Sequence, residues 1–403
     1  MAHDVAVIGA GPAGLCLAAA LSGCGLDVVV VEQQPEERLR APPDDGREIA
    51  LTHRSRRILD RLGLWQRFEE TEIAPLRDAL VLDGDAHLGL RFALSDRGEE
   101  PLGWLVPNNA IRRAAFEVAS TCPDVEVIAG RRVLQARCEA GGVRVALDDG
   151  RELEAQLLVA ADSRFSESRR AMGIAAELHD FARTMLVGRV RHEVGHDRVA
   201  WEWFRYGQTL ALLPLHDPNC SSAVITVGPD EARRLLSLRG EALDAELGRR
   251  FDGRLGRIKA VTEFHAYPLV GVYPRRFSGE RFVLVGDAAV GMHPVTAHGF
   301  NFGLLGIETL ARRLREAKNA GRAIHDASLL AGFAREHRRA TRPLYLATLI
   351  IGKLYADDRL PMRVARKALL GVVRRLPPFQ RLVVRTLTDV GETRRPRWMP
   401  QVR

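Results

Sequence analysis

Glycines and a carboxylate near the start of the chain have the spacing of a dinucleotide-binding turn. Gly9, Gly11 and Gly14 follow a short apolar run, and Glu32 comes eighteen residues after Gly14. Glycines so spaced allow a tight turn and a close approach of the backbone to a pyrophosphate, while the carboxylate accepts the ribose hydroxyls of an adenosine. We therefore expect the adenosine diphosphate half of a dinucleotide to be bound by Gly9, Gly11, Pro12, Ala13, Gly14, Glu32 and Gln33.

A second group of residues, near position 290, favours a flavin over a nicotinamide. Gly286 and Asp287 follow the apolar run 281–285, and Gly299, Phe300 and Asn301 come soon after. A carboxylate just past a strand end can accept hydrogen bonds from the ribityl hydroxyls of a flavin. The start of a helix beside the ring would stabilise the anion that forms on two-electron reduction. With the first turn, this group predicts one FAD held by distant segments.

The segments that must position these residues alternate between apolar runs and helical patterns. Residues 3–8 and 26–31 predict two buried strands joined by a helix that ends at about residue 23. Residues 281–285 and 304–314 predict a further strand and helix. Another apolar run ends in Asp162, which we expect to lie beside the same cofactor.

Five stretches of the chain together resemble the class A FAD-dependent aromatic hydroxylases, and within them the hydroxylases of ubiquinone biosynthesis. They are the glycine turn with Glu32, residues 45–51 with 62–65, residues 102–113, residues 157–169 and residues 281–303. The resemblance implies an α/β fold of the p-hydroxybenzoate hydroxylase type. In this fold a Rossmann-like FAD-binding domain carries an inserted antiparallel β-sheet substrate domain and C-terminal helices.

Changes in the pattern of apolar and aromatic residues along the chain predict where these parts lie. We expect a discontinuous FAD-binding domain in residues 1–75, 100–175 and 270–330, and a β-sheet substrate domain in residues 76–99 and 176–269. A helical region is expected over residues 331–403.

The resemblance also implies a reaction, the hydroxylation of an aromatic ring through a flavin C4a-hydroperoxide. It implies FAD and O₂, with NAD(P)H or a ferredoxin-type protein as electron donor, and a polyprenylated quinol or phenol of ubiquinone biosynthesis as substrate. Ser163 stands where the family has glycine, which weakens the expectation of direct nicotinamide use. Two other hypotheses stay open: an FAD-dependent prenyl-chain reductase, and a non-catalytic flavoprotein subunit of a lipid-biosynthesis complex. A halogenase is disfavoured because no lysine precedes Lys259.

Further site residues follow from the resemblance alone. It puts Arg47, Asn108 and Arg112 near the pyrophosphate; the alternative for each arginine is an ordinary surface residue. Pro294 and His298 are the catalytic candidates, close to the flavin ring. His298 stands where the family has glutamine, so it either tunes the flavin, relays a proton or fills the space of the glutamine.

The most aromatic segment of the chain is expected to form the wall of the substrate pocket. In this interpretation Trp201, Trp203 and Leu212 line the pocket. The alternative is a strand with one face in the hydrophobic core.

Composition limits the partners. The net charge is +8, but only four of the 59 basic residues are lysine, and no nucleic-acid motif is present. Five scattered cysteines predict a cytoplasmic protein with no metal site, and we expect neither a signal peptide nor a spanning helix. Residues 362–376 combine an apolar stripe with basic residues, as in a helix that meets an anionic inner-membrane surface or docks on protein. Other proteins of ubiquinone biosynthesis are further candidate partners.

Overall fold

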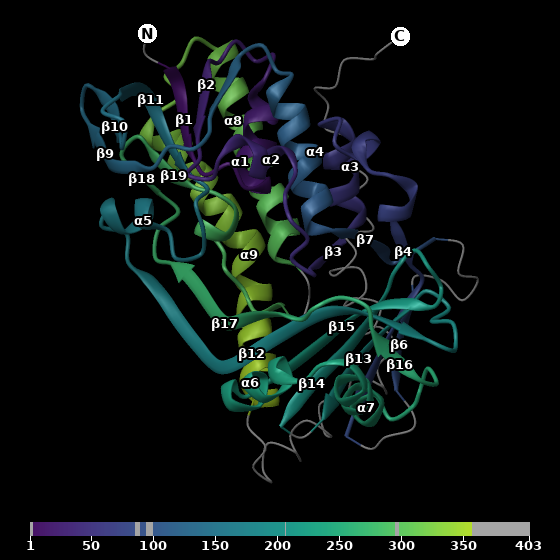
Figure 1. The fold of residues 1–403 in the computed structure, drawn as a ribbon. Coiled ribbons are helices and arrows are strands. Elements are labelled where there is room, and N and C mark those ends of the chain that lie inside the picture. The colour runs from purple at the N-terminus through teal and green to yellow at the C-terminus, as the bar shows by residue number, and fades with distance from the viewer. Residues whose placement is uncertain (1–2, 85–88, 94–99, 206, 295–297, 357–403) are drawn as a thin grey trace.

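The computed structural model describes residues 3–84, 89–93, 100–205, 207–294 and 298–356, and the strands of this part of the chain form three sheets (Figure 1). Sheet A runs in the order β18 (Ser278–Gly279), β19 (Phe282–Leu284), β11 (Glu152–Ala160), β1 (His3–Ile8), β2 (Val28–Val31) and β8 (Val125–Ile128). A hairpin of β9 (Val133–Glu139) and β10 (Gly142–Leu147) pairs with β11. Sheet B has the order β3 (Glu48–Leu51), β7 (Gly103–Pro107) and β4 (Ala74–Leu76).

Sheet C lies at the other end of the molecule (Figure 1) and is mostly antiparallel, with β13 and β5 paired in parallel. Its order is β16 (Ile258–Ala260), β12 (Ala176–His192), β15 (Cys220–Val227), β14 (Gln208–Pro214), β13 (Val199–Arg205), β5 (Asp78–Asp83) and β6 (Leu90–Ala93). The strand β17 (His265–Pro274) pairs with β12. Figure 1 shows β12 and β17 running from beside sheet A down into sheet C, so these two long strands connect the two halves.

Helices of different lengths pack on the sheets. They are α1 (Pro12–Leu21), α2 (Glu36–Arg40), α3 (His53–Arg61), α4 (Asn108–Ser120), α5 (Glu167–Ala171), α6 (Pro229–Ser237), α7 (Gly240–Arg250), α8 (Gly299–Asn319) and α9 (Ala327–Ala356). Short 3₁₀ turns are η1 (Trp65–Arg67), η2 (Glu70–Glu72) and η3 (Gly286–Ala288). The helix predicted over 304–314 begins earlier, at Gly299, so the glycine and its neighbours form its first turn.

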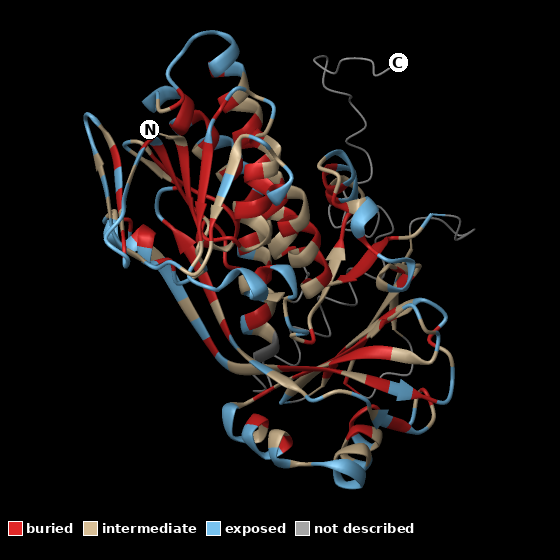
Figure 2. Cartoon of the chain, turned by 45° about the horizontal axis from the view of Figure 1, so that its top comes forward, coloured by how far each residue is buried: buried red, intermediate tan, exposed pale blue. Residues whose placement is uncertain are grey.

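Sheet A is buried on both faces, as its apolar runs predicted. The strand β2 consists of four valines, whose branched side chains favour an extended backbone. Val28 and Val30 pack toward α1, α4 and α8, while Val29 and Val31 pack toward the β9–β10 hairpin. Figure 2 shows this buried centre in red. Because β1, β2, β8, β11 and β19 pair in parallel, their carboxyl ends meet at one edge.

The C-terminal part of the described chain is the long helix α9, which packs against α8 and reaches sheet C. None of the helices within residues 3–356 that the structure describes is both long and apolar enough to cross a membrane. The predicted basic helix over 362–376 lies outside the described residues.

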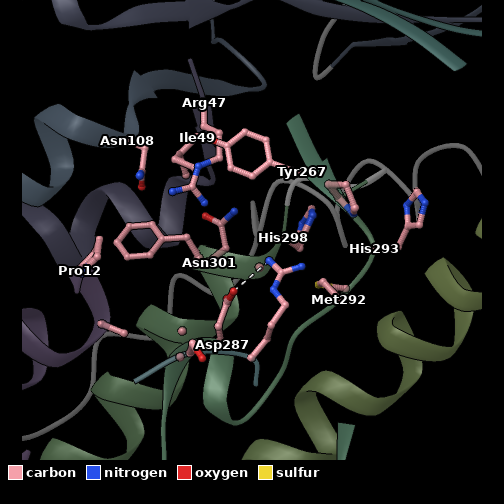
Figure 3. Close-up of a pocket in the computed structure, with 18 of the residues that line it drawn as sticks. Pro12, Arg47, Ile49, Asn108, Tyr267, Asp287, Met292, His293, His298 and Asn301 are labelled. Carbon is pink, nitrogen blue, oxygen red and sulfur yellow. Dashed lines mark hydrogen bonds and ion pairs between the residues drawn. The ribbon is translucent and has the colours of Figure 1, made fainter. Parts of the chain in front are cut away.

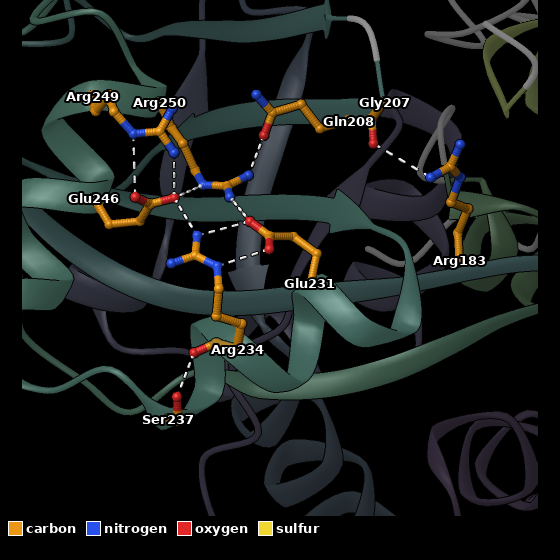
Figure 4. Close-up of polar contacts among 9 residues, drawn as sticks. All are labelled: Arg183, Gly207, Gln208, Glu231, Arg234, Ser237, Glu246, Arg249 and Arg250. Atoms are coloured by element: carbon orange, nitrogen blue, oxygen red, sulfur yellow. Dashed lines mark hydrogen bonds and ion pairs between the residues drawn. The ribbon is translucent and has the colours of Figure 1, made fainter.

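The helices α6 and α7 are joined behind sheet C by a network of ion pairs (Figure 4). Arg250 is 4% exposed, and its Nε donates to Glu246 Oε1 over 2.8 Å, while its other nitrogens contact Glu231 and Gln208. Burial alone would raise the pKa of Glu246, but hydrogen bonds from Arg249, Arg250 and Arg234 lower it to about 2. The network therefore holds a charged carboxylate against the back of the sheet.

Replacing Arg250 with methionine should lower the free energy of unfolding of the sheet C region by about 2 kcal/mol, because two carboxylates lose a buried charged donor. Arg234 still pairs with both, which limits the loss. Unfolding in urea, monitored by tryptophan fluorescence, measures the change in the free energy of unfolding. The matched control is Arg249→Met, which removes an exposed contact to the same Glu246 and should change stability by less than about 0.5 kcal/mol. Equal effects of the two substitutions would show that the buried ion pairs of Arg250 do not stabilise this region more than an exposed contact does.

Candidate active site

One continuous cavity of about 1790 Å³ lies between the carboxyl edge of sheet A, sheet B and sheet C. Residues from all the motifs of the sequence line it (Figure 3). The lining includes Gly9, Gly11, Pro12, Ala13, Glu32, Gln33, Arg47, Asn108, Arg112, Asp162, Gly286, Asp287, Pro294, His298, Gly299, Phe300 and Asn301. Of the residues predicted to bind the cofactor, Gly14 does not line the cavity.

The three glycines of the first turn have different surroundings. Gly9 has a φ of +106°, and a Cβ there would lie 2.7 Å from the carbonyl oxygen of Ala161. A Cβ on Gly14 would lie 1.9 Å from the carbonyl oxygen of Gly9, so this glycine lets α1 pack closely on β1. A Cβ on Gly11 would meet nothing within 4 Å. Gly9 and Gly14 are therefore needed by the fold, whereas Gly11 leaves open space in the cavity.

The start of α1 and Glu32 form the rim of this open space. Pro12 occupies the first turn of α1, and no side chain caps the amides there. The carboxylate of Glu32 accepts hydrogen bonds from the backbone N–H groups of Ala10 and Gln34, over 2.8 and 2.9 Å. An uncapped helix N-terminus attracts phosphate, and a carboxylate fixed beside it can accept ribose hydroxyls.

The carboxyl ends of β11 and β19 bring two aspartates to the same cavity. Asp287 pairs with Arg164, whose Nη2 lies 3.1 Å from Oδ2 (Figure 3). Asp162 accepts from the backbone N–H of Ser168 over 3.1 Å, and its other oxygen is buried without a hydrogen-bond partner among the described residues. A Cβ on Gly286 would lie 2.6 Å from the Cβ of Ala13, so η3 packs directly on α1.

A polar cluster from three different segments forms the opposite wall. Arg47 Nη2 lies 2.6 Å from Asp45 Oδ2, and Asn108 donates to the same oxygen over 2.7 Å. Burial would raise the pKa of Asp45, but the hydrogen bond and charge of Arg47 hold it below its ordinary value. The hydroxyl of Tyr267 donates to the backbone carbonyl of Asp45, and its ring lies under the Arg47 guanidinium. Farther along the cavity, Arg112 donates to Gln34 over 3.1 Å.

The first turn of α8 closes the remaining side. His298 is 5% exposed and stands at the N-terminal end of the helix, with its ring centroid 6.0 Å from that of Phe302. Asn301 donates to the carbonyl of Ala50 over 2.8 Å and accepts from the N–H of Thr52 over 3.1 Å. Its amide therefore ties α8 to the segment that carries Arg47. Phe300 and Pro294 line the cavity.

His293, next to Pro294, was not predicted to belong to the site. Burial, with a smaller contribution from His179, lowers the pKa of His293 to about 4. Its imidazole is therefore neutral near pH 7, and its ring packs edge-on against Phe181.

The predicted substrate-pocket residues need a correction. Trp203 and Leu212 are each 3% exposed and belong to the core behind sheet C, not to the cavity lining. Side chains of a strand alternate between its faces, so the cavity side of β13 carries Glu202 and Phe204 instead. Trp201 reaches the cavity lining in part, but it also packs against the core behind the sheet.

Besides His293 and Glu202, three further polar residues of the site were missed from the sequence. Arg164 lies two residues after Asp162, and Asp45 lies two residues before Arg47, so position next to a motif was a usable signal for both. Tyr267 comes from β17, and nothing in its local sequence marks it.

The cavity fits an FAD molecule. Gly11 leaves open space beside the uncapped start of α1, and Asp162 keeps one buried oxygen without a partner among the described residues. Glu32, Asp287 and the first turn of α8 all border the same cavity. The parts of the cofactor that each of them would bind are proposed below.

Substituting Gly11 and Gly14 separates the two functions of the turn. Gly11→Ala should leave the fold intact and weaken FAD binding at least tenfold, because its methyl group occupies space that a pyrophosphate would use. Gly14→Ala should destabilise the protein by several kcal/mol, on the order of an overpacked core. FAD content after gel filtration and thermal unfolding of the apoprotein measure both effects. Full FAD affinity in Gly11→Ala would contradict the placement of the phosphates.

Comparison with known proteins shows which family the chain belongs to. The chain matches the FAD binding domain family over residues 2–340. It is 44% identical to the ubiquinone hydroxylase UbiM of Neisseria meningitidis over 389 residues, which cover 96% of this chain and 84% of that protein. It is 35% identical to the ubiquinone hydroxylase UbiL of Rhodospirillum rubrum, over 95% of this chain and 88% of that protein.

A solved structure shares the fold. The p-nitrophenol 4-monooxygenase PnpA of Pseudomonas putida superposes with a TM-score of 0.75 at 19% identity, over 96% of this chain and 98% of that chain. The predicted fold class is thereby confirmed. The chain belongs to the FAD binding domain family, among the flavoprotein hydroxylases of the ubiquinone type, and it is an FAD-dependent monooxygenase.

Proposed function

We propose that the protein hydroxylates the aromatic ring of a polyprenylated quinol or phenol on the route to ubiquinone. The observation that carries this proposal is the continuity of the cavity, which extends from the glycine turn into a chamber walled by apolar side chains. Val81, Leu90 and Phe92 line the chamber from sheet C, and Leu102 and Leu105 line it from the side of sheet B. An apolar chamber of this kind suits a prenyl tail better than a small polar phenol.

FAD held in the cavity would supply the oxidative chemistry, which is the transfer of one oxygen atom from O₂ to an electron-rich ring. The chain itself binds, orients and excludes water. We assign Glu32 to the adenosine ribose, Arg47, Asn108 and Arg112 to the pyrophosphate side, and Asp287 to the ribityl chain.

Two features of the site would exclude water from the reacting ring and hold the cavity walls in place. The apolar chamber excludes water from the reacting ring. The ion pair of Asp287 with Arg164 and the bridge that Asn301 makes to Ala50 and Thr52 fix the walls around the flavin position. Because Asn301 uses its amide on the backbone, we propose that it positions the wall, while Pro294 and His298 face the ring.

Labelled oxygen tests the proposed reaction. Reduced holoprotein incubated with ¹⁸O₂ and a geranyl-substituted phenol should yield a product with one labelled oxygen atom, read by mass spectrometry. An unprenylated phenol should react far less, because it leaves the chamber unfilled. A product with a saturated chain and no label would instead identify a prenyl-chain reductase, and bound flavin with no product from any phenol would identify a non-catalytic subunit. Gly11→Ala, depleted of FAD, is the matched control.

The electron donor is part of the proposal. NAD(P)H and a ferredoxin-type protein are the two candidate donors, and anaerobic bleaching of the flavin absorbance by each donor, with and without substrate, distinguishes them. The donor that bleaches the flavin at a rate matching turnover is the one the enzyme uses.

Contact with an anionic membrane is proposed from the sequence, because a prenylated substrate resides in lipid and the inner membrane borders the cytoplasm. Full-length protein should sediment with vesicles that contain anionic lipid and less with zwitterionic ones. Replacing Arg363, Arg366, Lys367, Arg374 and Arg375 with glutamine should abolish the difference. Unchanged sedimentation of this variant would contradict a role for residues 362–376.

A further inference from the structure

The cavity face of sheet C carries the carboxyl group of Glu202, to which the proposed function assigns no role. Glu202 of β13 pairs with Ala211 of β14 on one side and with Val81 of β5 on the other. The same row continues to Val224 of β15 and Val187 of β12. All five residues line the cavity, so Glu202 is the single ionisable residue in an otherwise apolar row.

The environment of Glu202 keeps its carboxyl neutral. Burial raises its pKa to about 8, and no charged group contributes to that shift. On β14 the flanking cavity residues, Thr209 and Leu213, are uncharged. On β5 the nearest ionisable residue is Asp83, which pairs with Phe204 rather than with Glu202. Within the described residues, the Glu202 carboxyl makes no hydrogen bond or ion pair that would offset its burial.

A polar group in an apolar cavity costs free energy unless a partner forms hydrogen bonds with it. A neutral carboxyl offers one O–H donor and a carbonyl acceptor, which match the oxygens of a phenol or quinol. The prenyl tail offers no such partner.

The position of Glu202 would allow a substrate ring to lie against the cavity face of sheet C. Glu202 lies three strands from Val187, a distance of about 14 Å at the usual spacing of neighbouring strands. The polar cluster at Tyr267 borders that side of the sheet, since Tyr267 pairs with Met185 of β12. On the other side of Glu202 the wall continues through Val81 and Phe92. A ring can therefore lie between the carboxyl and the polar cluster, with its tail along the apolar wall.

We propose that the neutral carboxyl of Glu202 donates a hydrogen bond to an oxygen on the substrate ring and so orients the ring in the chamber. The inference rests on the proposed function, because it takes a neutral phenol or quinol as the ligand.

Ligand binding to the oxidised holoenzyme tests this without turnover. A geranyl-substituted phenol is titrated into wild type, Glu202→Leu and Glu202→Gln, and the change in flavin absorbance gives the dissociation constant. Glu202→Leu should bind the phenol roughly 10- to 100-fold more weakly, because it loses one hydrogen bond in a site from which water is excluded. Glu202→Gln keeps a neutral donor and should bind within about threefold of wild type. Glu263→Gln, an exposed carboxyl outside the cavity, is the matched control and should change nothing.

The pH profile separates a direct contact from a packing effect. Wild-type affinity should fall above pH 8, because ionisation removes the donor and leaves a charge in the apolar chamber. The affinity of Glu202→Gln should stay level between pH 6.5 and 9, roughly the window around that pKa.

Two results would overturn the assignment: equal affinity of wild type and Glu202→Leu, or parallel pH profiles of wild type and Glu202→Gln. If wild type inserts labelled oxygen into the phenol in either case, the proposed function stands and only the role of Glu202 falls. If wild type binds no phenol at all, both the proposed function and the role of Glu202 are wrong.

Discussion

The close contact between α1 and the carboxyl edge of sheet A is the constraint on which the rest of the site depends. Gly14 lets the helix approach the carbonyl of Gly9, and Gly286 lets η3 pack on Ala13 of the same helix. Larger residues at either position would push the helix away from the edge. The uncapped amides of α1, Glu32 and Asp287 would then no longer face one space. Parallel pairing supplies the other half of the constraint, because it places the ends of β1, β2, β11 and β19 side by side.

Contacts between distant segments convert this edge into a closed site. Asn301 hydrogen bonds to the backbone at Ala50 and Thr52, and Arg164 pairs with Asp287 across more than a hundred residues of chain. The long strands β12 and β17 carry the wall onward into sheet C. The cofactor crevice and the apolar chamber are thus parts of one cavity, which suits a reaction between a flavin and a ring on a long apolar tail.

The sequence predicted the parts of the site that local spacing encodes. The glycine turn, Glu32 and the Gly286–Asp287 turn follow from strand, turn and helix patterns, and all of these residues except Gly14 line one cavity. The sequence could not predict which faces of β13 and β14 meet the cavity, because apolar residues occur on both faces of each strand. Trp203 and Leu212 were consequently assigned to the wrong side. Tyr267 and the backbone contacts of Asn301 depend on long-range packing, which no local pattern reports.

We propose that one cavity holds the flavin and a prenylated ring at the same time. Equilibrium dialysis of the holoprotein with a geranyl-substituted phenol, with FAD and phenol counted in the same sample, shows whether both molecules are bound together. One phenol should bind per chain while the FAD stays bound. Release of FAD in proportion to the phenol taken up would contradict it, since the two molecules would then compete for a single space.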